Sequence, residues 1–172
     1  GHWWFEGPEF LREVLRLCAQ PDSVVQLRTA ADYLADFPIN AVCEPAPSSW
    51  GEGGYSAVWI DNSNDWIYRH VHHAETKMCE LARAHPSPSE LCRRALNQLM
   101  RELLLAQSSD WAFIMKTGTA VRYATDRVKS HLSRFHRLTR EIESETIDSE
   151  WLADLESRDN IFPDIDYKVY AG

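Results

Sequence analysis

The sequence lacks a run of about 18 apolar residues, the length a membrane-spanning helix needs, and it has no signal-peptide pattern. We therefore expect no contact with a membrane. It also lacks a Cys-x-x-Cys pair and histidines at zinc-finger spacing, because its four cysteines are widely separated: Cys18, Cys43, Cys79 and Cys92. This spacing predicts reduced, mostly buried thiols in a cytoplasmic protein. An initiator Met is missing too, and we expect the chain to be a piece of a longer protein.

Positive charge is scarce. Lys and Arg total 18 against 26 for Asp and Glu, which gives a formal net charge of −8. Such a chain repels phosphate backbones and anionic lipid, so nucleic acid and membrane surfaces are excluded as partners. A neutral ligand such as a sugar is unaffected by this charge.

The length of 172 residues suits one domain with a sizeable core. Hydrophobic residues make up 44% of the chain and charged residues 26%, which is ordinary for a globular protein, whereas seven tryptophans is a high number. We predict a single α-helical domain over residues 1–172.

Apolar residues recur every three or four positions along most of the chain, which is the period of an amphipathic helix. The pattern predicts helices over about residues 8–19, 64–84 and 88–108, a short helix capped by Thr29, a helical turn ending before Gly118, and further helices from Thr119 and Asp148. In the short helix, Tyr33, Leu34 and Phe37 are expected to face inward. The predicted fold is all-α, a helical bundle of about six helices with one long aromatic-rich loop.

The helix over residues 88–108 carries two apolar stripes, which predicts burial on two sides and a central place in the bundle. The segment Ser87-Pro88-Ser89-Glu90 is typical of a capping box with proline at the first helical position. Gly118 is expected to end the preceding turn in a left-handed conformation. The tail over residues 160–167 is predicted to be extended and to lie against the bundle.

The aromatic loop covers residues 39–63, where prolines and glycines interrupt any helical period. Loops longer than roughly 12 to 15 residues tend to be functional or disordered, and this one is too aromatic to be disordered. Trp50 follows two serines, three glycines come next, and Trp59 closes the stretch. Rings on such a loop can stack on sugar rings or can form a core cluster, and spacing alone favours neither.

Residues for catalysis or metal binding are few. His70 and His73 lie one helical turn apart, but no His-Glu-x-x-His motif and no third ligand accompany them, so a polar helix face is favoured over a metal site. A retaining glycosidase needs two carboxylates roughly 5 to 5.5 Å apart. Glu52 and Asp110 lie in cleft-like contexts without an evident partner, and Asp110 is equally well explained as a helix N-cap. We expect no metal and no other cofactor.

Five ordered motifs resemble one family of enzymes. They are Gly-His-Trp-Trp-Phe-Glu-Gly-Pro-x-Phe-Leu at the start, Ser-Ser-Trp-Gly-x-Gly-Gly-Tyr-x-x-x-Trp from Ser48, Asn-Asp-Trp-Ile-Tyr-Arg-His-x-His from Asn64, the run from Arg101 to Ile114, and the tail from Asp159 to Tyr167. Over residues 1–167 they resemble the C-terminal part of glycoside hydrolase family 57, in its 1,4-α-glucan branching enzyme subgroup.

The resemblance implies an all-α C-terminal domain that closes over the cleft of an N-terminal catalytic barrel of the same protein. In the family, that barrel supplies a glutamate nucleophile and an aspartate acid/base, and neither is expected in this chain, which would be inactive alone. Residues 1–7 would end the catalytic-domain motif, and residues 39–63 would be a Trp-rich substrate loop. The expected partner molecule is an α-glucan such as amylose or glycogen.

The resemblance also implies which side chains contact the substrate: His2, Trp3, Trp50, Trp59, Asp110 and Trp111. Trp66, at the start of a helix, is expected to belong to the core instead. Three alternatives stay open. Two are other enzymes of the same family, an amylase or a 4-α-glucanotransferase, and the third is a non-catalytic module that binds glucan or another protein.

Overall fold

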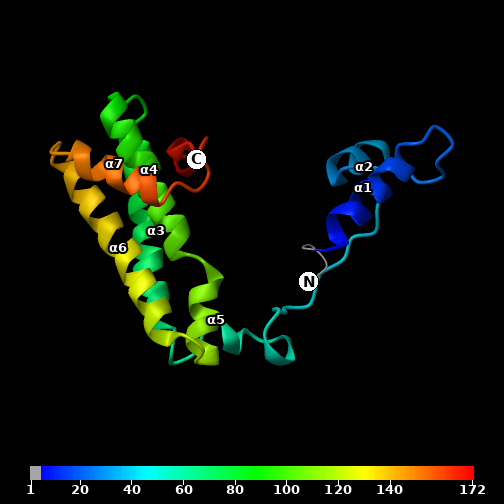
Figure 1. Ribbon diagram of the computed structural model, residues 1–172, viewed down its shortest axis with the longest axis horizontal. Coiled ribbons are helices and arrows are strands. Elements are labelled where there is room, and N and C mark those ends of the chain that lie inside the picture. Colours follow the sequence, from blue (N-terminus) through cyan, green and yellow to red (C-terminus); the bar gives the residue numbers. More distant parts are fainter. Residues whose placement is uncertain (1–4) are drawn as a thin grey trace. The chain divides into compact units, whose positions relative to one another are not determined.

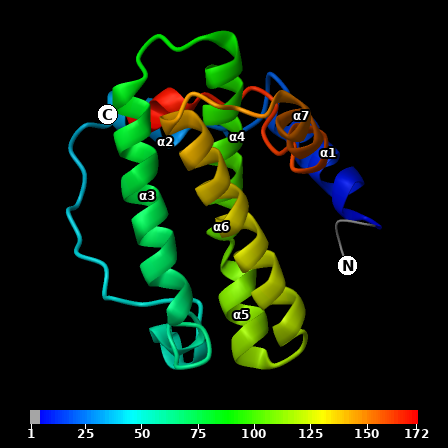
Figure 2. The same ribbon diagram turned by 90° about the vertical axis from the view of Figure 1, so that its left-hand side faces the viewer.

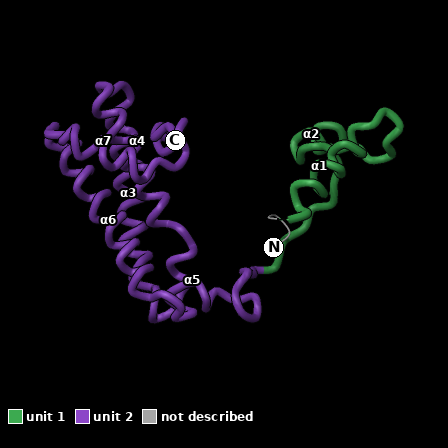
Figure 3. The backbone as a smooth tube through the Cα atoms, viewed as in Figure 1, with its two compact units in different colours: residues 1–46 green, residues 47–172 purple. Residues whose placement is uncertain are grey.

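The computed structural model describes residues 5–172, and these form seven α-helices and three short 3-10 turns without a β-strand (Figure 1). The all-α prediction is confirmed. The chain divides into two compact units, Gly1–Ala46 and Pro47–Gly172, which we describe separately (Figure 3). No helix in the described part is long and apolar enough to cross a bilayer.

The first unit contains α1 (Gly7–Cys18) and α2 (Ala30–Asp36). Pro8 lies in the first turn of α1, where its missing N–H is not needed for the helical ladder. Thr29 caps α2 as predicted, because its Oγ1 accepts a hydrogen bond of 3.1 Å from the Asp32 amide. Both helices thus begin where the sequence places them.

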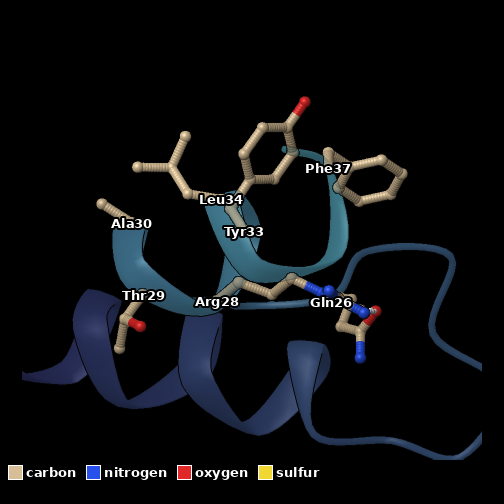
Figure 4. Close-up of a pocket in the computed structure, with 7 residues that line it drawn as sticks. All are labelled: Gln26, Arg28, Thr29, Ala30, Tyr33, Leu34 and Phe37. Atoms are coloured by element: carbon tan, nitrogen blue, oxygen red, sulfur yellow. Dashed lines mark hydrogen bonds between the residues drawn. The ribbon is translucent and has the colours of Figure 1, made fainter. Parts of the chain in front are cut away.

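The apolar side chains of α1 and α2 are exposed. Neither helix has a buried residue, and Tyr33, Leu34 and Phe37 are each about half exposed, so the prediction that they face inward is wrong. In Figure 4, Tyr33 and Leu34 point away from α1 on the outer side of α2. A unit of this size has too few elements to cover two apolar helix faces by itself. The cysteines are likewise not buried: Cys18, Cys79 and Cys92 are half-buried and Cys43 is exposed, all as free thiols.

The second unit is a helical bundle. Three long helices run alongside one another, as Figure 2 shows: α3 (Trp66–Ala84), α4 (Glu90–Ala106) and α6 (Val121–Glu143). The shorter elements pack on these, with α5 (Ser109–Thr117) on α6, α7 (Ser149–Arg158) on α4, and the 3-10 turn η3 (Tyr167–Tyr170) on α3 and α4. Since α4 contacts α3, α6, α7 and η3, its predicted central place is confirmed.

The core follows the predicted apolar stripes. On α3 every member of the stripe is buried, namely Ile67, Val71, Ala74, Met78 and Leu81. On α4 both stripes are covered, with these residues buried: Ala95, Leu96, Leu99, Met100, Leu103 and Ala106. Trp66 is partly buried and packs against this core, as predicted for a residue that belongs to the helix and not to the aromatic loop.

In the second unit, the predicted helix ends at Gly118 and Asp148 are confirmed, whereas the predicted starts at Ser87 and Thr119 are wrong, since α6 begins at Val121. Gly118 ends α5 with φ of 74°, the left-handed region that favours glycine, and the Asp148 carboxylate accepts a 3.0 Å bond from the Trp151 amide at the start of α7. The capping box at Ser87 does not form. Ser89 is in the extended conformation and accepts a 3.3 Å bond from the Cys92 amide, so α4 starts two residues later than predicted and Pro88 lies outside it.

A polar network lies inside this apolar core. Glu102 on α4 and His131 on α6 are fully buried, and His131 Nδ1 lies 2.7 Å from Glu102 Oε2. Gln98 Nε2 donates to Glu102 Oε1 at 3.1 Å and to the Asp159 carbonyl at 3.2 Å. Arg134 Nη1 bonds the Asp159 carboxylate at 2.8 Å, so the network joins α4, α6 and the end of α7.

The C-terminal tail lies against the bundle, as predicted, but it is not extended throughout, because a turn forms in which the Ile165 amide donates to the Phe162 carbonyl at 3.1 Å. Arg101 Nε donates to the Ile161 carbonyl at 2.8 Å, and the fully buried Tyr167 donates its hydroxyl to the His85 carbonyl at 2.5 Å. These bonds satisfy polar groups that the core would otherwise leave unpaired.

We expect His131→Ala to lower the free energy of unfolding of the protein by about 3 kcal/mol or more, because removing one partner leaves a buried carboxylate without its close hydrogen bond. Urea denaturation of the complete protein measures the change. His136→Ala is the matched control, since His136 is exposed on the same helix. Equal stabilities of the two variants would contradict the structural importance of the Glu102–His131 pair.

Candidate functional site

Three aromatic rings meet near the start of α3, beside α5. The ring centroids of Trp50, Trp59 and Phe113 lie 6.4, 6.3 and 6.2 Å apart in pairs, all with tilted planes. Trp59 and Phe113 are half-buried, whereas Trp50 is 84% exposed. We call these three rings the aromatic platform. It places the exposed ring of Trp50 against two half-buried rings.

The loop that carries Trp50 is closed by its own backbone. It forms two 3-10 turns, η1 (Glu52–Gly54) and η2 (Ser56–Val58), and the Ser49 amide donates to the Gly54 carbonyl at 2.7 Å. Gly53 and Gly54 have φ of 65° and 79°, a conformation that side chains with a Cβ rarely adopt. The glycines are therefore needed for the fold of the loop and not only for its flexibility.

One buried amide attaches this loop to the bundle. Asn64 is fully buried, and its Nδ2 donates to the carbonyls of Val58 at 3.0 Å and Ala112 at 3.1 Å. Its Oδ1 accepts a 2.8 Å bond from the Asp61 amide. Since Ala112 belongs to α5, Asn64 fixes the aromatic loop against the helix that supplies Phe113.

An ion pair makes a second attachment. Lys116 Nζ on α5 lies 2.8 Å from Asp61 Oδ2. The hydrogen bond from Lys116, followed by those from the amide and hydroxyl of Ser63, lowers the pKa of Asp61 from 3.8 to about 2. The carboxylate is therefore ionised at neutral pH and holds the loop by charge as well as by hydrogen bonding.

The structure places the predicted site residues in three different environments. Trp50 and Trp59 lie together on the aromatic platform. Asp110 is exposed in the first turn of α5 and precedes Phe113 by three residues, so the two share a helix face. The N-cap of α5 is Ser108, so the N-cap explanation of Asp110 is wrong.

Trp111 has a different environment from the platform rings. It is only 9% exposed, its Nε1 donates to the Leu105 carbonyl at 2.7 Å, and its ring meets Tyr123 edge-on at 6.0 Å. It therefore holds α5 on the bundle from the inner side. His2 and Trp3 lie outside the described residues.

Sequence patterns do not identify two residues that the site needs. Phe113 looks like an ordinary core position of a short helix, and Asn64 looks like a residue at a helix start. Phe113 lies on the outer face of α5 with Asp110. This orientation of the helix follows from the packing of Trp111 on the inner side. One of the three hydrogen bonds of Asn64 reaches Ala112, which is 48 residues away in the sequence, and a local pattern cannot encode such a contact.

A metal does not fit the one cluster of ligand-type side chains found in residues 5–172. The ligand atoms of Glu102, His131 and Asp159 lie within 4.8 Å of one another. Arg134 Nη1 lies 2.8 Å from the Asp159 carboxylate and 3.7 Å from that of Glu102, so a guanidinium already neutralises these carboxylates. On α3, His70 and His73 are exposed, and His73 faces His136 with ring centroids 6.2 Å apart.

Comparison with known proteins decides the family. A family model described as 1,4-alpha-glucan branching enzyme, C-terminal, matches residues 70–170. The chain belongs to this family. The branching-enzyme resemblance of the sequence motifs is thereby confirmed, and the matched region is the bundle from α3 to η3.

Individual relatives agree with this branching-enzyme family. A 1,4-alpha-glucan branching enzyme of Thermococcus kodakarensis is 35% identical over 94% of this chain and 24% of its own length. Among solved structures, a GH57-type branching enzyme from Pyrococcus horikoshii is 37% identical with a TM-score of 0.72 and covers the whole of this chain. The α-amylase AmyC from Thermotoga maritima is 42% identical over the whole chain, with a TM-score of 0.65.

The chain spans about a quarter to a third of these relatives: 24% of the Thermococcus enzyme, 33% of the Pyrococcus chain and 31% of AmyC. The similarity to AmyC also shows that this helical architecture occurs beside more than one activity.

We expect Asn64→Ala to destabilise the protein by about 1–3 kcal/mol, because it leaves the buried carbonyl of Ala112 and its other partners without a hydrogen bond. Asn62→Ala, at an exposed position of the same loop, is the control. Thermal unfolding followed by tryptophan fluorescence tests both. If Asn64→Ala unfolds like the control, the loop is held by something other than this amide.

We expect the stability contributed by Asp61 to be present above pH 3.8 and to be lost as the pH falls towards about 2, since its pKa is lower in the folded state. Asp61→Asn should therefore lower the melting temperature at neutral pH and flatten its decline over this acidic range. Asp65→Asn, at a nearby exposed carboxylate, should keep the decline. A full acidic decline in Asp61→Asn would show that the ion pair with Lys116 does not stabilise the loop.

Proposed function

We propose that this chain is the C-terminal part of a 1,4-α-glucan branching enzyme and that its aromatic platform forms one wall of the substrate cleft. The observation that supports this most directly is the exposure of Trp50 on a loop fixed by Asn64 and Lys116. A flat indole held in place can stack on the apolar face of a glucose ring with little loss of conformational entropy. The net charge of −8 does not oppose a neutral glucan.

Catalysis would come from the N-terminal barrel of the same protein, which would provide the two carboxylates that glycosidic bond cleavage requires. The barrel is also the proposed partner for the exposed apolar side of α1, where Phe10, Leu11 and Leu15 have no cover within their own unit. His2 and Trp3 would lie beside the acid/base, as the family motif implies.

The reaction explains why a wall is needed. A branching enzyme breaks an α-1,4 bond, holds a glucosyl-enzyme intermediate, and transfers the glucan to a sugar 6-hydroxyl instead of to water. Water must therefore be kept from the intermediate while the acceptor chain is positioned. The loop from Ser48 to Trp59 would screen the intermediate, and the exposed carboxylate of Asp110 would accept hydrogen bonds from sugar hydroxyls. Trp111, being buried, would act by holding α5.

A hydrolytic amylase is the second candidate, because AmyC is 42% identical to this chain. A 4-α-glucanotransferase is the other alternative enzyme, as the family resemblance implies. The products formed from amylose distinguish the three activities, since only a branching enzyme creates α-1,6 bonds. If the protein is instead a non-catalytic glucan-binding module, glycogen in a native gel would slow its migration, and no product would form from amylose.

We expect Trp50→Ala in the complete enzyme to raise hydrolysis relative to branching several-fold, because losing the exposed ring opens the wall to water and removes a stacking surface for the acceptor. Reducing-end release and α-1,6 bond content after incubation with amylose give the ratio. Phe162→Ala removes an exposed ring elsewhere in the same unit and should leave the ratio as it is.

An unchanged ratio in Trp50→Ala would overturn the screening role of the loop. If Trp50→Ala also migrates like the unaltered enzyme in a native gel containing glycogen, the aromatic platform is not part of the substrate cleft.

A further inference from the structure

The long helices α3 and α6 run side by side in the same direction, as Figure 2 shows. Two contacts fix which of their residues are neighbours on the outer side of this pair. Lys129 Nζ lies 5.9 Å from the centroid of the Trp66 ring near the start of α3. Further along both helices, the rings of His73 and His136 lie with their centroids 6.2 Å apart.

Two more side chains join the two histidines on the same face. His70 precedes His73 by three positions on α3, and Arg140 follows His136 by four positions on α6, so each lies one helical turn from its neighbour. All four side chains are exposed. We call the set of His70, His73, His136 and Arg140 the histidine cluster.

The histidine cluster has no carboxylate partner within residues 5–172. Other arginines of α6 are paired, for example Arg134 with Asp159 at 2.8 Å. The two carboxylates nearest along this face, Glu80 and Glu143, lie 3.0 and 2.9 Å from Lys77 Nζ and are thereby neutralised. The charged and titratable side chains of the face are therefore His70, His73, Lys77 and Glu80 on α3 and Lys129, His136, Arg140 and Glu143 on α6.

The members of the histidine cluster repel one another when they are charged. Burial, followed by the charges of His73, His70 and Arg140, lowers the pKa of His136 below its ordinary value. A bound anion would reverse the sign of this interaction, because it attracts Arg140 and favours the protonated imidazoles. The net charge of the whole chain is −8, so the positive charge of this face is local.

The face is open to solvent in the second unit. The elements that pack on the two helices lie elsewhere: α4 contacts their buried sides, and Tyr170 of η3 lies near Glu75 and Cys79 on another side of α3. Covering the histidine cluster with another domain would bury charged groups and little apolar surface, which is unfavourable. The cluster is therefore suited to a small, solvent-borne ligand.

The chemistry of the cluster selects the class of this ligand. A neutral sugar gains nothing from the charge of Arg140, and a cation is repelled by it. A metal ion is also disfavoured, because these histidines do not form a cluster whose ligand atoms all lie within 4.8 Å of one another. A phosphate group carries up to two negative charges and several acceptor oxygens, so it can accept hydrogen bonds from both helices at once.

We infer that the histidine cluster is a binding site for a phosphate group, with Arg140 as its permanent charge and His73 and His136 as hydrogen-bond donors from the two helices. His70 adds a third imidazole beside His73. Free phosphate and a phosphorylated sugar share this chemistry. The site is separate from the aromatic platform, and the inference does not depend on the proposed function.

The test measures binding of radiolabelled sulfate to the complete protein by equilibrium dialysis at about pH 6 and about pH 8, on either side of the ordinary histidine pKa. Sulfate stays a dianion over this range, so any change in its affinity reports on the protein. We expect affinity to be about tenfold higher at the lower pH, because an anion that raises a histidine pKa by one unit gains a factor of ten.

Two variants separate the contributions. Arg140→Met should weaken sulfate binding about tenfold at both pH values, because it removes the permanent charge. His136→Asn should make the affinity less dependent on pH. The matched controls are Arg122→Met, at an exposed arginine of α6 that pairs with Asp126, and His72→Asn, at an exposed histidine of α3 that contacts Tyr68. Both controls should bind sulfate like the unaltered protein.

Competition with the labelled sulfate distinguishes the two sources of phosphate. Displacement at lower concentration by glucose 6-phosphate than by inorganic phosphate would identify a phosphorylated sugar as the ligand, and the reverse order would identify free phosphate. The inference is wrong if sulfate does not bind, if neither competitor displaces it, or if Arg140→Met binds it as tightly as Arg122→Met does.

Discussion

The amide of Asn64 is buried where three chain segments meet, and it hydrogen-bonds to backbone groups of each: Asp61 before α3, Val58 in η2 and Ala112 in α5. Leaving any of these groups unpaired in the interior would cost free energy, so the loop has one low-energy place on the bundle. Trp59 and Phe113 lie on either side of this attachment. The exposed ring of Trp50 has a defined position because it contacts the rings of Trp59 and Phe113, which this attachment holds in place.

The bundle below supplies the rigidity that this attachment needs. Helix α5 is held by the buried Trp111 and by its packing on α6, and α6 is joined to α4 through Glu102 and His131. A buried carboxylate requires its partners in one geometry, which fixes the register of the two helices as well as their distance. The platform therefore rests on a chain of contacts that begins in the middle of the core.

If the aromatic platform binds a glucan as proposed, stacking supplies affinity and gives little information on orientation, because stacking on an indole ring tolerates rotation about the ring axis. The exposed carboxylate of Asp110, on the same face of α5 as Phe113, would then supply hydrogen bonds, which are directional. Together, the two features would give both affinity and register to a glucan, which a transferase needs more than a hydrolase does.

The sequence by itself determined the helices and the family. Apolar periodicity gives α3, α4 and α6 with their buried faces, and side-chain chemistry gives the ends at Thr29, Gly118 and Asp148, because both depend on residues within one or two turns. Only the tertiary structure decided which aromatic residues reach the surface: Trp111 lies inside and Phe113 outside, although they are two positions apart. It also decided that α1 and α2 leave their apolar faces exposed, since burial depends on what covers a face and not on the pattern of the face itself.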